Sequence, residues 1–459
     1  MNQKHYLLSG AFWLTCTGFL TRIAGFFYKI FLSRTIGAAQ IGLYGLTMPV
    51  YSFCMAFACG GIQTAVSRFT AEYYAKKDRR SALLLLLASL LISGGLAVFC
   101  SVLLYLNADL IALRFLLEVR CAELLQILAV SLPFCVIHSC FCGYFTGQKN
   151  IAPSAVSQLL EQIFRIGSVF FFYAVSAANG HQMDASIMAL GQLFGELVSA
   201  LYCILYLFFH SKHSIRAEDI RHIFLNDRQM LVRNARLTLS VSVPLGLNRM
   251  LLGVLQGIEA SLLPQKLQFF GYSSNEALAV YGTLTGMSLP LLLFPTAITG
   301  ALGTLLLPSV SEARTLHHRK QISATANACF YGSIVLGLLF SSGFFVSGKV
   351  IGNLLFGNKL AGTYITHLAW ICPFLYLNTT MTSILHGLGK STEIFLWNMA
   401  GFAIRLTAIA VFVPKIGIDA YLYGMICSQL FISICTVILL ASSHTLTFRI
   451  PRFSLKAPH

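Results

Sequence analysis

The chain has 459 residues, of which 56% are apolar and only 10% are charged. A soluble domain carries about 25% charged residues, so this composition excludes soluble enzymes, nucleic-acid-binding modules and disordered chains. The formal net charge of +16 is then expected to reflect basic loops that orient a membrane protein. The sequence predicts an all-α polytopic membrane protein.

Apolar runs long enough to cross the hydrocarbon core as helices, about 20 residues each, occur about twelve times. The first run is too long for a signal peptide and lacks a small-residue cleavage pattern before Gly37, so we expect a retained transmembrane helix. The predicted spans are 7–33, 40–67, 82–106, 122–146, 152–176, 185–210, 237–262, 278–308, 325–347, 362–387, 393–414 and 420–443.

The distribution of basic residues tests this helix count. With a cytoplasmic N-terminus, 20 of the 32 basic residues fall on the inside and 7 on the outside. This asymmetry follows the positive-inside rule, so both termini are expected in the cytoplasm. The remaining 5 lie inside the predicted helices, and these carry the information about function.

The longest polar segment, 211–236, divides the helices six and six. Because six is even, both halves begin on the same side, which is typical of parallel repeats about an axis along the membrane normal. Weak matches at an offset near 240 support a duplication, among them Arg165 with Arg405 and Gln158 with Asn398. The predicted six-helix lobes are residues 1–220 and 221–459.

Charges inside membrane helices are costly and usually face a cavity. Arg22 and Lys29 are seven residues apart and share one face of the first helix. They form a cationic stripe suited to a phosphate or carboxylate, with snorkelling towards an interface as the alternative. Arg249, in the seventh helix, has no obvious partner within its own helix, and Glu196 lies in the sixth.

Glu161 and Arg165 form an i,i+4 pair beside Gln158. Such a pair can be purely structural or can act as a switch if substrate or a proton competes for one partner, and both readings stay open. Arg405 has no acid at Gly401, which makes it the better candidate for binding an anion.

His138 and His386 lie in apolar helices and could relay protons, although a lone intramembrane histidine is more often hydrogen-bonded and inert. The 13 cysteines lie mostly within apolar runs and lack zinc-site spacing. The thiols of Cys140 and Cys142 would face apart on a helix, so we interpret the cysteines as small apolar side chains. Nucleotide-binding, catalytic and metal-ligating motifs are absent from the sequence, which predicts neither an enzyme nor a cofactor.

Four sequence runs carry a family resemblance: Leu-Thr-Arg-Ile-Ala-Gly-Phe-Phe-Tyr-Lys-Ile-Phe-Leu-Ser-Arg-Thr-Ile-Gly at 20–37, Pro-Ser-Ala-Val-Ser-Gln-Leu-Leu-Glu-Gln-Ile-Phe-Arg at 153–165, Gly-Met-Ser-Leu-Pro-Leu-Leu-Leu-Phe-Pro at 286–295 and Leu-Pro-Ser-Val-Ser-Glu-Ala at 307–313. They resemble the multidrug/oligosaccharidyl-lipid/polysaccharide flippase superfamily, especially its stage V sporulation protein B and polysaccharide biosynthesis branch, and more distantly the lipid II flippase.

The resemblance implies a V-shaped transporter of two lobes that exposes a cationic cavity alternately to each side of a bacterial cytoplasmic membrane. It implies a polyprenyl-pyrophosphate-linked glycan as substrate, in peptidoglycan, polysaccharide or spore envelope synthesis. Arg22 and Arg34 match basic positions of the lipid II flippase in the first helix.

The sequence therefore predicts a flippase for an anionic glycan lipid, with membrane lipids as surroundings, H⁺ or Na⁺ as candidate coupling ions, and no nucleic-acid partner. The alternatives are a multidrug or cation antiporter of the same superfamily and a non-transporting scaffold for envelope synthesis. The predicted substrate-binding residues are Arg22, Lys29, Arg249 and Arg405. The predicted cavity or gating residues are Gln158, Glu161, Arg165, Glu196, Asn398 and Arg34.

Overall fold

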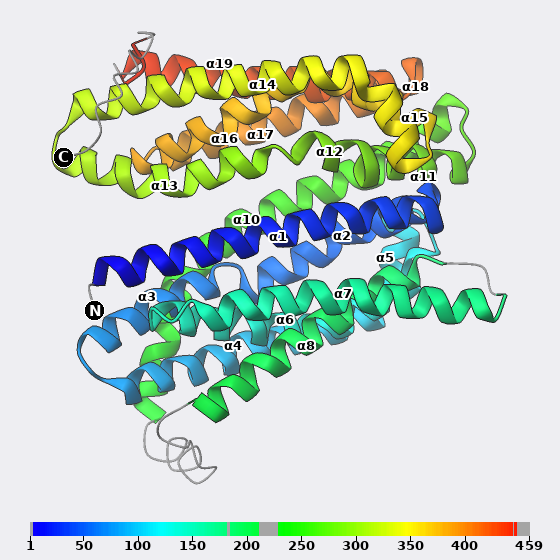
Figure 1. Cartoon of the computed structure of the whole chain (residues 1–459). Helices are drawn as coiled ribbons and strands as arrows, with labels where there is room; N and C mark the ends of the chain where they lie inside the picture. The colour runs from blue at the N-terminus through cyan, green and yellow to red at the C-terminus, as the bar shows by residue number, and fades with distance from the viewer. Residues whose placement is uncertain (1–2, 181–183, 211–227, 444, 448–459) are drawn as a thin grey trace. The chain divides into compact units, whose positions relative to one another are not determined.

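The computed structural model describes residues 3–180, 184–210, 228–443 and 445–447, and every regular element in these ranges is helical (Figure 1). Most of the predicted polar loop, residues 211–227, lies outside the described residues. Contacts divide the chain into two compact units. The first unit comprises Met1–Tyr28 and Gln40–Ser261, and the second comprises Lys29–Ala39 and Leu262–His459.

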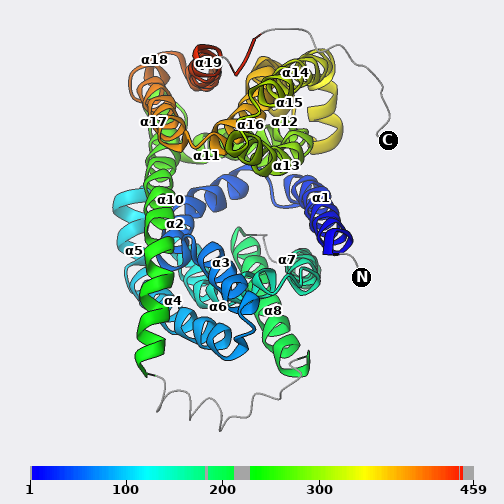
Figure 2. The same ribbon diagram turned by 90° about the vertical axis from the view of Figure 1, so that its left-hand side faces the viewer.

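The first unit is a helical bundle built around α6. This helix packs against α3, α4 and α8, and α8 also packs against α7 (Figure 2). Its buried face carries leucines, aromatic residues and cysteines, which explains why so apolar a helix occupies the centre. The helices are α1 (Gln3–Thr35, shared with the second unit), α2 (Ala38–Cys59), α3 (Ile62–Ala75), α4 (Arg79–Leu106), α5 (Ala108–Ile111), η1 (Ala112–Leu116), α6 (Cys121–Gly147), α7 (Ala152–Ala178), α8 (Ser186–His210) and α10 (Arg228–Phe270).

The second unit repeats this style of packing. Its helix α16 packs against α13, α14 and α19, and α19 also packs against α17. The helices are α11 (Ser274–Gly282), η2 (Thr283–Ser288), α12 (Leu289–Leu293), α13 (Thr296–Thr315), α14 (Arg319–Phe356), α15 (Lys359–Leu368), η3 (Ala369–Ile371), α16 (Cys372–Gly387), α17 (Ser391–Thr407), η4 (Ala408–Phe412), α18 (Val413–Ile416) and α19 (Ile418–Ser442).

Eleven helical segments in the described ranges are long and apolar enough to cross a membrane. They coincide in order with the second to the twelfth predicted spans, and α1 covers the first. The prediction of an all-α polytopic membrane protein is confirmed.

Three boundaries differ from the prediction. Helix α10 has 43 residues, or about 65 Å at 1.5 Å per residue, twice the hydrocarbon thickness. It begins at Arg228, so the end of the predicted polar loop is helical. The division between the compact units falls within this helix, after Ser261, and the lobes 1–220 and 221–459 stay a prediction. Helix α14 likewise extends beyond its predicted span to 38 residues. The predicted eighth span is interrupted before Thr296, where Pro295 precedes α13.

Glycines set the closest helix approaches in the first unit. A Cβ at Gly143 of α6 would lie 2.7 Å from the Gln63 carbonyl oxygen of α3. A Cβ at Gly195 of α8 would lie 2.8 Å from the Glu161 carbonyl oxygen of α7. Small residues allow membrane helices to pack backbone to backbone, and the second of these contacts positions the candidate site.

Candidate functional site

The centre of the candidate site is the ion pair between Glu161 and Arg165 on α7. The Arg165 guanidinium donates a hydrogen bond to the Glu161 carboxylate, one helical turn away. The two side chains are only 19% and 23% exposed. Because an ion pair gains strength where water is scarce but loses hydration, this pair needs support from its neighbours.

A second carboxylate, Glu196 of α8, lies beside this pair because α7 and α8 approach closely. Cβ atoms at Gly191 and Gly195 would lie 3.0 Å and 2.8 Å from the carbonyl oxygens of Arg165 and Glu161. Glu196 is 5% exposed and accepts a hydrogen bond of 3.0 Å from Gln192, one turn earlier on α8. The glycines thus bring two carboxylates from different helices together.

His138 of α6 joins the two carboxylates. Its Nδ1 atom lies 3.7 Å from one oxygen of Glu161 and 3.7 Å from one oxygen of Glu196. Its Nε2 atom lies 2.9 Å from the hydroxyl of Ser157 on α7. The imidazole is therefore held between α7 and α8 by polar contacts on both of its nitrogens.

This carboxylate cluster, which we define as His138, Glu161, Arg165 and Glu196, is suited to a small cation. The ligand atoms of its histidine and two glutamates lie within 4.8 Å of one another. Among the described residues, Glu196 Oε2 and Arg165 Nε are buried without a hydrogen-bond partner. With a neutral imidazole at His138, two carboxylates against one guanidinium leave a negative charge that a proton or Na⁺ would neutralise.

The four predicted substrate-binding cations are divided between the units. Arg22 and Arg249 belong to the first unit, and Lys29 and Arg405 belong to the second. Arg22 and Arg249 are exposed, whereas Lys29 and Arg405 are half-buried. The guanidinium of Arg405 lies 4.2 Å from the centre of the Phe402 ring, a cation–π contact. The convergence of the four cations on one anion stays a prediction.

Arg249 has a pocket of its own inside the first unit. Helices α2 and α10 enclose about 380 Å³, and polar groups of Tyr51, Ser52 and Gln256 line the space with Arg249. An exposed arginine beside apolar walls and a few polar groups suits a charged headgroup carried on an apolar chain.

Arg34 contacts the end of another helix. Its guanidinium donates hydrogen bonds to the carbonyl oxygens of Leu354 and Leu355, the latter at 2.8 Å. These carbonyls belong to the last turn of α14, where a cation is favourable. Asn398 donates to the Ile394 carbonyl oxygen of its own helix, and Gln158 is half-buried on α7. Gating roles for these three residues stay predictions.

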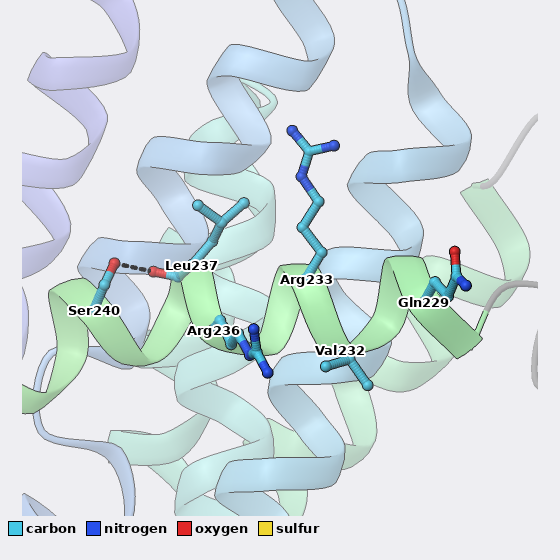
Figure 3. A pocket seen from close by; sticks show the side chains of 6 residues that line it. All are labelled: Gln229, Val232, Arg233, Arg236, Leu237 and Ser240. Atoms are coloured by element: carbon cyan, nitrogen blue, oxygen red, sulfur yellow. Dashed lines mark hydrogen bonds between the residues drawn. The ribbon is translucent and has the colours of Figure 1, made fainter.

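A second pocket, of about 500 Å³, lies along the start of α10 (Figure 3). Arg233 and Arg236 line it, and their side chains extend from the helix in different directions, while Ser240 donates a hydrogen bond of 2.7 Å to the Leu237 carbonyl oxygen. Both arginines belong to the segment predicted to face the cytoplasm, so they fit the orientation signal read from the sequence.

His138 lies at the centre of the carboxylate cluster and is hydrogen-bonded to Ser157, as the sequence favoured for an intramembrane histidine. A role of His138 in proton relay stays a prediction. Ser157 and Gln192 were missed. The available signal was a repeated i,i+4 spacing of polar residues on neighbouring helices, namely Ser157 with Glu161 and Gln192 with Glu196.

Residues 7–314 match the family described as polysaccharide biosynthesis protein. This chain belongs to that family. Stage V sporulation protein B of Bacillus subtilis is 25% identical, over 98% of this chain and 87% of the relative. Lipid II flippase MurJ of the same organism is also 25% identical, over 87% of this chain and 76% of the relative. The resemblance read from the sequence is confirmed.

Solved structures agree on the fold. An inward-facing multidrug resistance MATE family transporter of the MOP superfamily aligns with a TM-score of 0.73 and 14% identity, over 93% of this chain and 94% of the other. Lipid II flippase MurJ in an inward closed conformation aligns with a TM-score of 0.67 and 13% identity, over 93% and 87%. At these identities the likeness establishes the transporter fold.

Proposed function

We propose that this protein flips or exports a polyprenyl-pyrophosphate-linked glycan precursor across the cytoplasmic membrane of a bacterium by alternating access. The observation that carries the proposal is the relationship over most of the chain to a protein named as a lipid II flippase. The multi-pass helical fold and the family membership support it. The termini are assigned to the cytoplasm because 20 basic residues then lie inside.

The anionic headgroup is assigned to the intramembrane cations. Arg22, Lys29, Arg249 and Arg405 are basic residues in apolar helices, where a charge costs about 2.5–3.5 kcal/mol on insertion scales. A pyrophosphate offers several oxygens to which guanidinium groups bind well. The pocket around Arg249 supports this assignment, because its apolar walls suit the adjoining lipid.

The membrane potential can supply a driving force. Carrying one negative charge outwards across an inside-negative membrane releases about 2.3 kcal/mol per 100 mV. A pyrophosphate that moves with its charge uncompensated is therefore driven without nucleotide hydrolysis.

The carboxylate cluster is assigned as the entry point for a coupling cation, H⁺ or Na⁺. Glu196 supports this role because one of its buried carboxylate oxygens has no hydrogen-bond partner among the described residues. A cation between Glu161 and Glu196 would weaken the hold of Glu161 on Arg165. Because the three residues join α7 to α8, the exchange would bias the packing of these helices.

The flippase assignment is tested by measuring transbilayer movement of a fluorescent polyprenyl-pyrophosphate glycan in proteoliposomes. Wild type should flip the lipid, and Arg22→Ala should lower the rate at least about tenfold, equivalent to about 1.4 kcal/mol. Arg319→Ala is the matched control, because Arg319 is an exposed basic residue at the start of α14, outside the predicted site. Equal rates for wild type and Arg22→Ala would refute the anion site.

The second candidate function is a cation or drug antiporter of the same superfamily. The observation that favours it is the pair of carboxylates, Glu161 and Glu196, which could hold an organic cation directly. Drug efflux driven by a proton or Na⁺ gradient, in vesicles that show no lipid flipping, would select this function over the first.

A further inference from the structure

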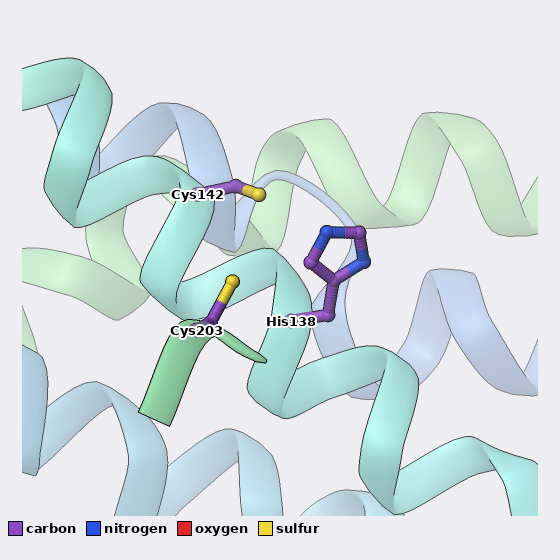
Figure 4. A group of neighbouring side chains, drawn as sticks. All are labelled: His138, Cys142 and Cys203. Atoms are coloured by element: carbon purple, nitrogen blue, oxygen red, sulfur yellow. The ribbon is translucent and has the colours of Figure 1, made fainter. Parts of the chain in front are cut away.

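A second group of ligand atoms lies on the other side of His138. Cys142, one turn later on α6, and Cys203 of α8 place their sulfur atoms beside the imidazole (Figure 4). The imidazole nitrogen and the two sulfurs all lie within 4.8 Å of one another. Both thiols are free, and all three residues are buried.

The donor set selects a class of metal. Two cysteine sulfurs and one imidazole are the ligands that Zn²⁺ takes at sites with three protein ligands and one open position. Oxygen-preferring cations such as Mg²⁺ or Ca²⁺ do not choose sulfur. The Ser157 hydroxyl lies 3.5 Å from Cys142 Sγ and 2.9 Å from His138 Nε2, next to the position that a fourth ligand would take.

The surroundings orient the histidine for this task. Its Nδ1 atom faces Glu161 and Glu196 at 3.7 Å, so a metal would bind Nε2 and replace its 2.9 Å contact with the Ser157 hydroxyl. Histidines that bind zinc usually present their second nitrogen to a carboxylate in this way, which fixes the ring and raises its basicity. The carboxylates therefore serve here as positioning residues and not as ligands.

Charge balance favours such a site in a membrane interior. Zn²⁺ displaces one proton from each of the two thiols, and the resulting ion with two thiolates and a neutral imidazole carries no net charge. A neutral complex avoids the large cost of an uncompensated charge in a low-dielectric medium.

We propose that His138, Cys142 and Cys203 form a Zn²⁺ site that links α6 to α8 within the first unit. The sequence predicted no metal ligands, because Cys142 and Cys203 are 61 residues apart and helix packing alone brings them together. The proposal stands independently of the transported substrate.

Binding is tested on the full-length protein in detergent with a reductant present. After dialysis against Zn²⁺ and removal of free metal, wild type should retain one zinc per chain by elemental analysis. Co²⁺ added to the metal-free protein should give thiolate-to-cobalt charge-transfer absorption. Cys142→Ser and Cys203→Ser should each weaken zinc binding roughly 100-fold. Cys140→Ser is the matched control, because Cys140 is buried on the same helix outside the three-ligand group.

The unfolding temperature, measured with and without Zn²⁺, provides a second test if one variant folds poorly. Zn²⁺ should raise the unfolding temperature of wild type and of Cys140→Ser but not that of the other two variants. Two results would overturn the proposal. One is wild type that retains no zinc and shows no cobalt band. The other is equal zinc retention by all three cysteine variants.

Discussion

The polar interiors of the two units differ in charge although their helices pack alike. In the first unit, α6, α7 and α8 bring together His138, Glu161 and Glu196. The residues 240 positions after His138 and Glu161 are Asn378 and Gly401. At these two positions the first unit therefore carries titratable side chains and the second does not, whereas Arg165 corresponds to another cation, Arg405.

The second unit has a hydrogen-bonded cluster at this place, which we call the amide cluster: Asn378, Gln429 and Ser433. Asn378 donates to the Gln429 side-chain oxygen at 2.8 Å and accepts from the Ser433 hydroxyl at 2.9 Å. Its groups join α16 to α19. A neutral hydrogen bond contributes about 1 kcal/mol to stability. The amide cluster has no carboxylate to bind a proton or a metal cation.

The amide cluster can only stabilise the packing of its unit, whereas the carboxylate cluster can also respond to an ion. Both clusters connect neighbouring helices, but in the proposed function only the carboxylate cluster carries charges that respond to a bound cation. We therefore assign the proposed coupling to the first unit.

The largest effect on stability is expected from Glu161→Ala. This change leaves the Arg165 guanidinium without its carboxylate, and each side chain is only about one-fifth exposed. We expect a loss of about 2–3 kcal/mol, less than for a wholly buried pair. Replacing both residues by alanine should recover most of that loss, as measured by denaturant unfolding in detergent. Equal losses in the single and double variants would show that the pair is not coupled.

Gly195→Ala should disturb the carboxylate cluster without removing any charge. The new Cβ would lie 2.8 Å from the Glu161 carbonyl oxygen, so α7 and α8 must move apart at a cost of about 1–3 kcal/mol. Gly167→Ala is the control, because a Cβ there meets nothing within 4 Å. If Gly167→Ala is as unstable as Gly195→Ala, the loss of stability does not come from the close contact between α7 and α8.

Gln429→Ala should have a smaller effect in the second unit. It removes a neutral partner of Asn378 and should cost about 1 kcal/mol. If thermal unfolding shows a larger loss than for Glu161→Ala, the contrast between charged and neutral clusters does not hold.

The smallest effect is expected at Asp78, outside both clusters, which caps α4. The Ser81 hydroxyl and backbone N–H hold the pKa of the Asp78 carboxyl below its usual range. The stabilisation is thus present above the unfolded pKa, near 4, and is lost as pH falls through the lower folded value. Asp78→Ala should cost about 0.5 kcal/mol at neutral pH, the low end for a helix cap that water screens, and flatten the acid limb of the stability curve. An unchanged acid limb would contradict this linkage.

The membrane helices could be predicted because apolar runs and basic loops are local signals. The helical start of α10 at Arg228 could not be predicted, because the prediction depended on apolar runs and the first residues of α10 are mostly polar. The i,i+4 pair of Glu161 and Arg165 was visible in one helix. Its neighbours His138 and Glu196 come from two other helices, and glycine-mediated packing brings them close, which a single sequence does not encode locally.

The central claim is that the carboxylate cluster of the first unit, and not the amide cluster of the second, governs the coupling of transport. It is tested by flipping of the fluorescent glycan lipid under an imposed membrane potential, with Glu196→Gln and Gln429→Ala compared in parallel. Glu196→Gln keeps the side-chain shape but removes the charge. The account predicts at least a tenfold loss for Glu196→Gln, or about 1.4 kcal/mol, and a rate within about twofold of wild type for Gln429→Ala, about 0.4 kcal/mol. Wild-type flipping by Glu196→Gln would contradict it.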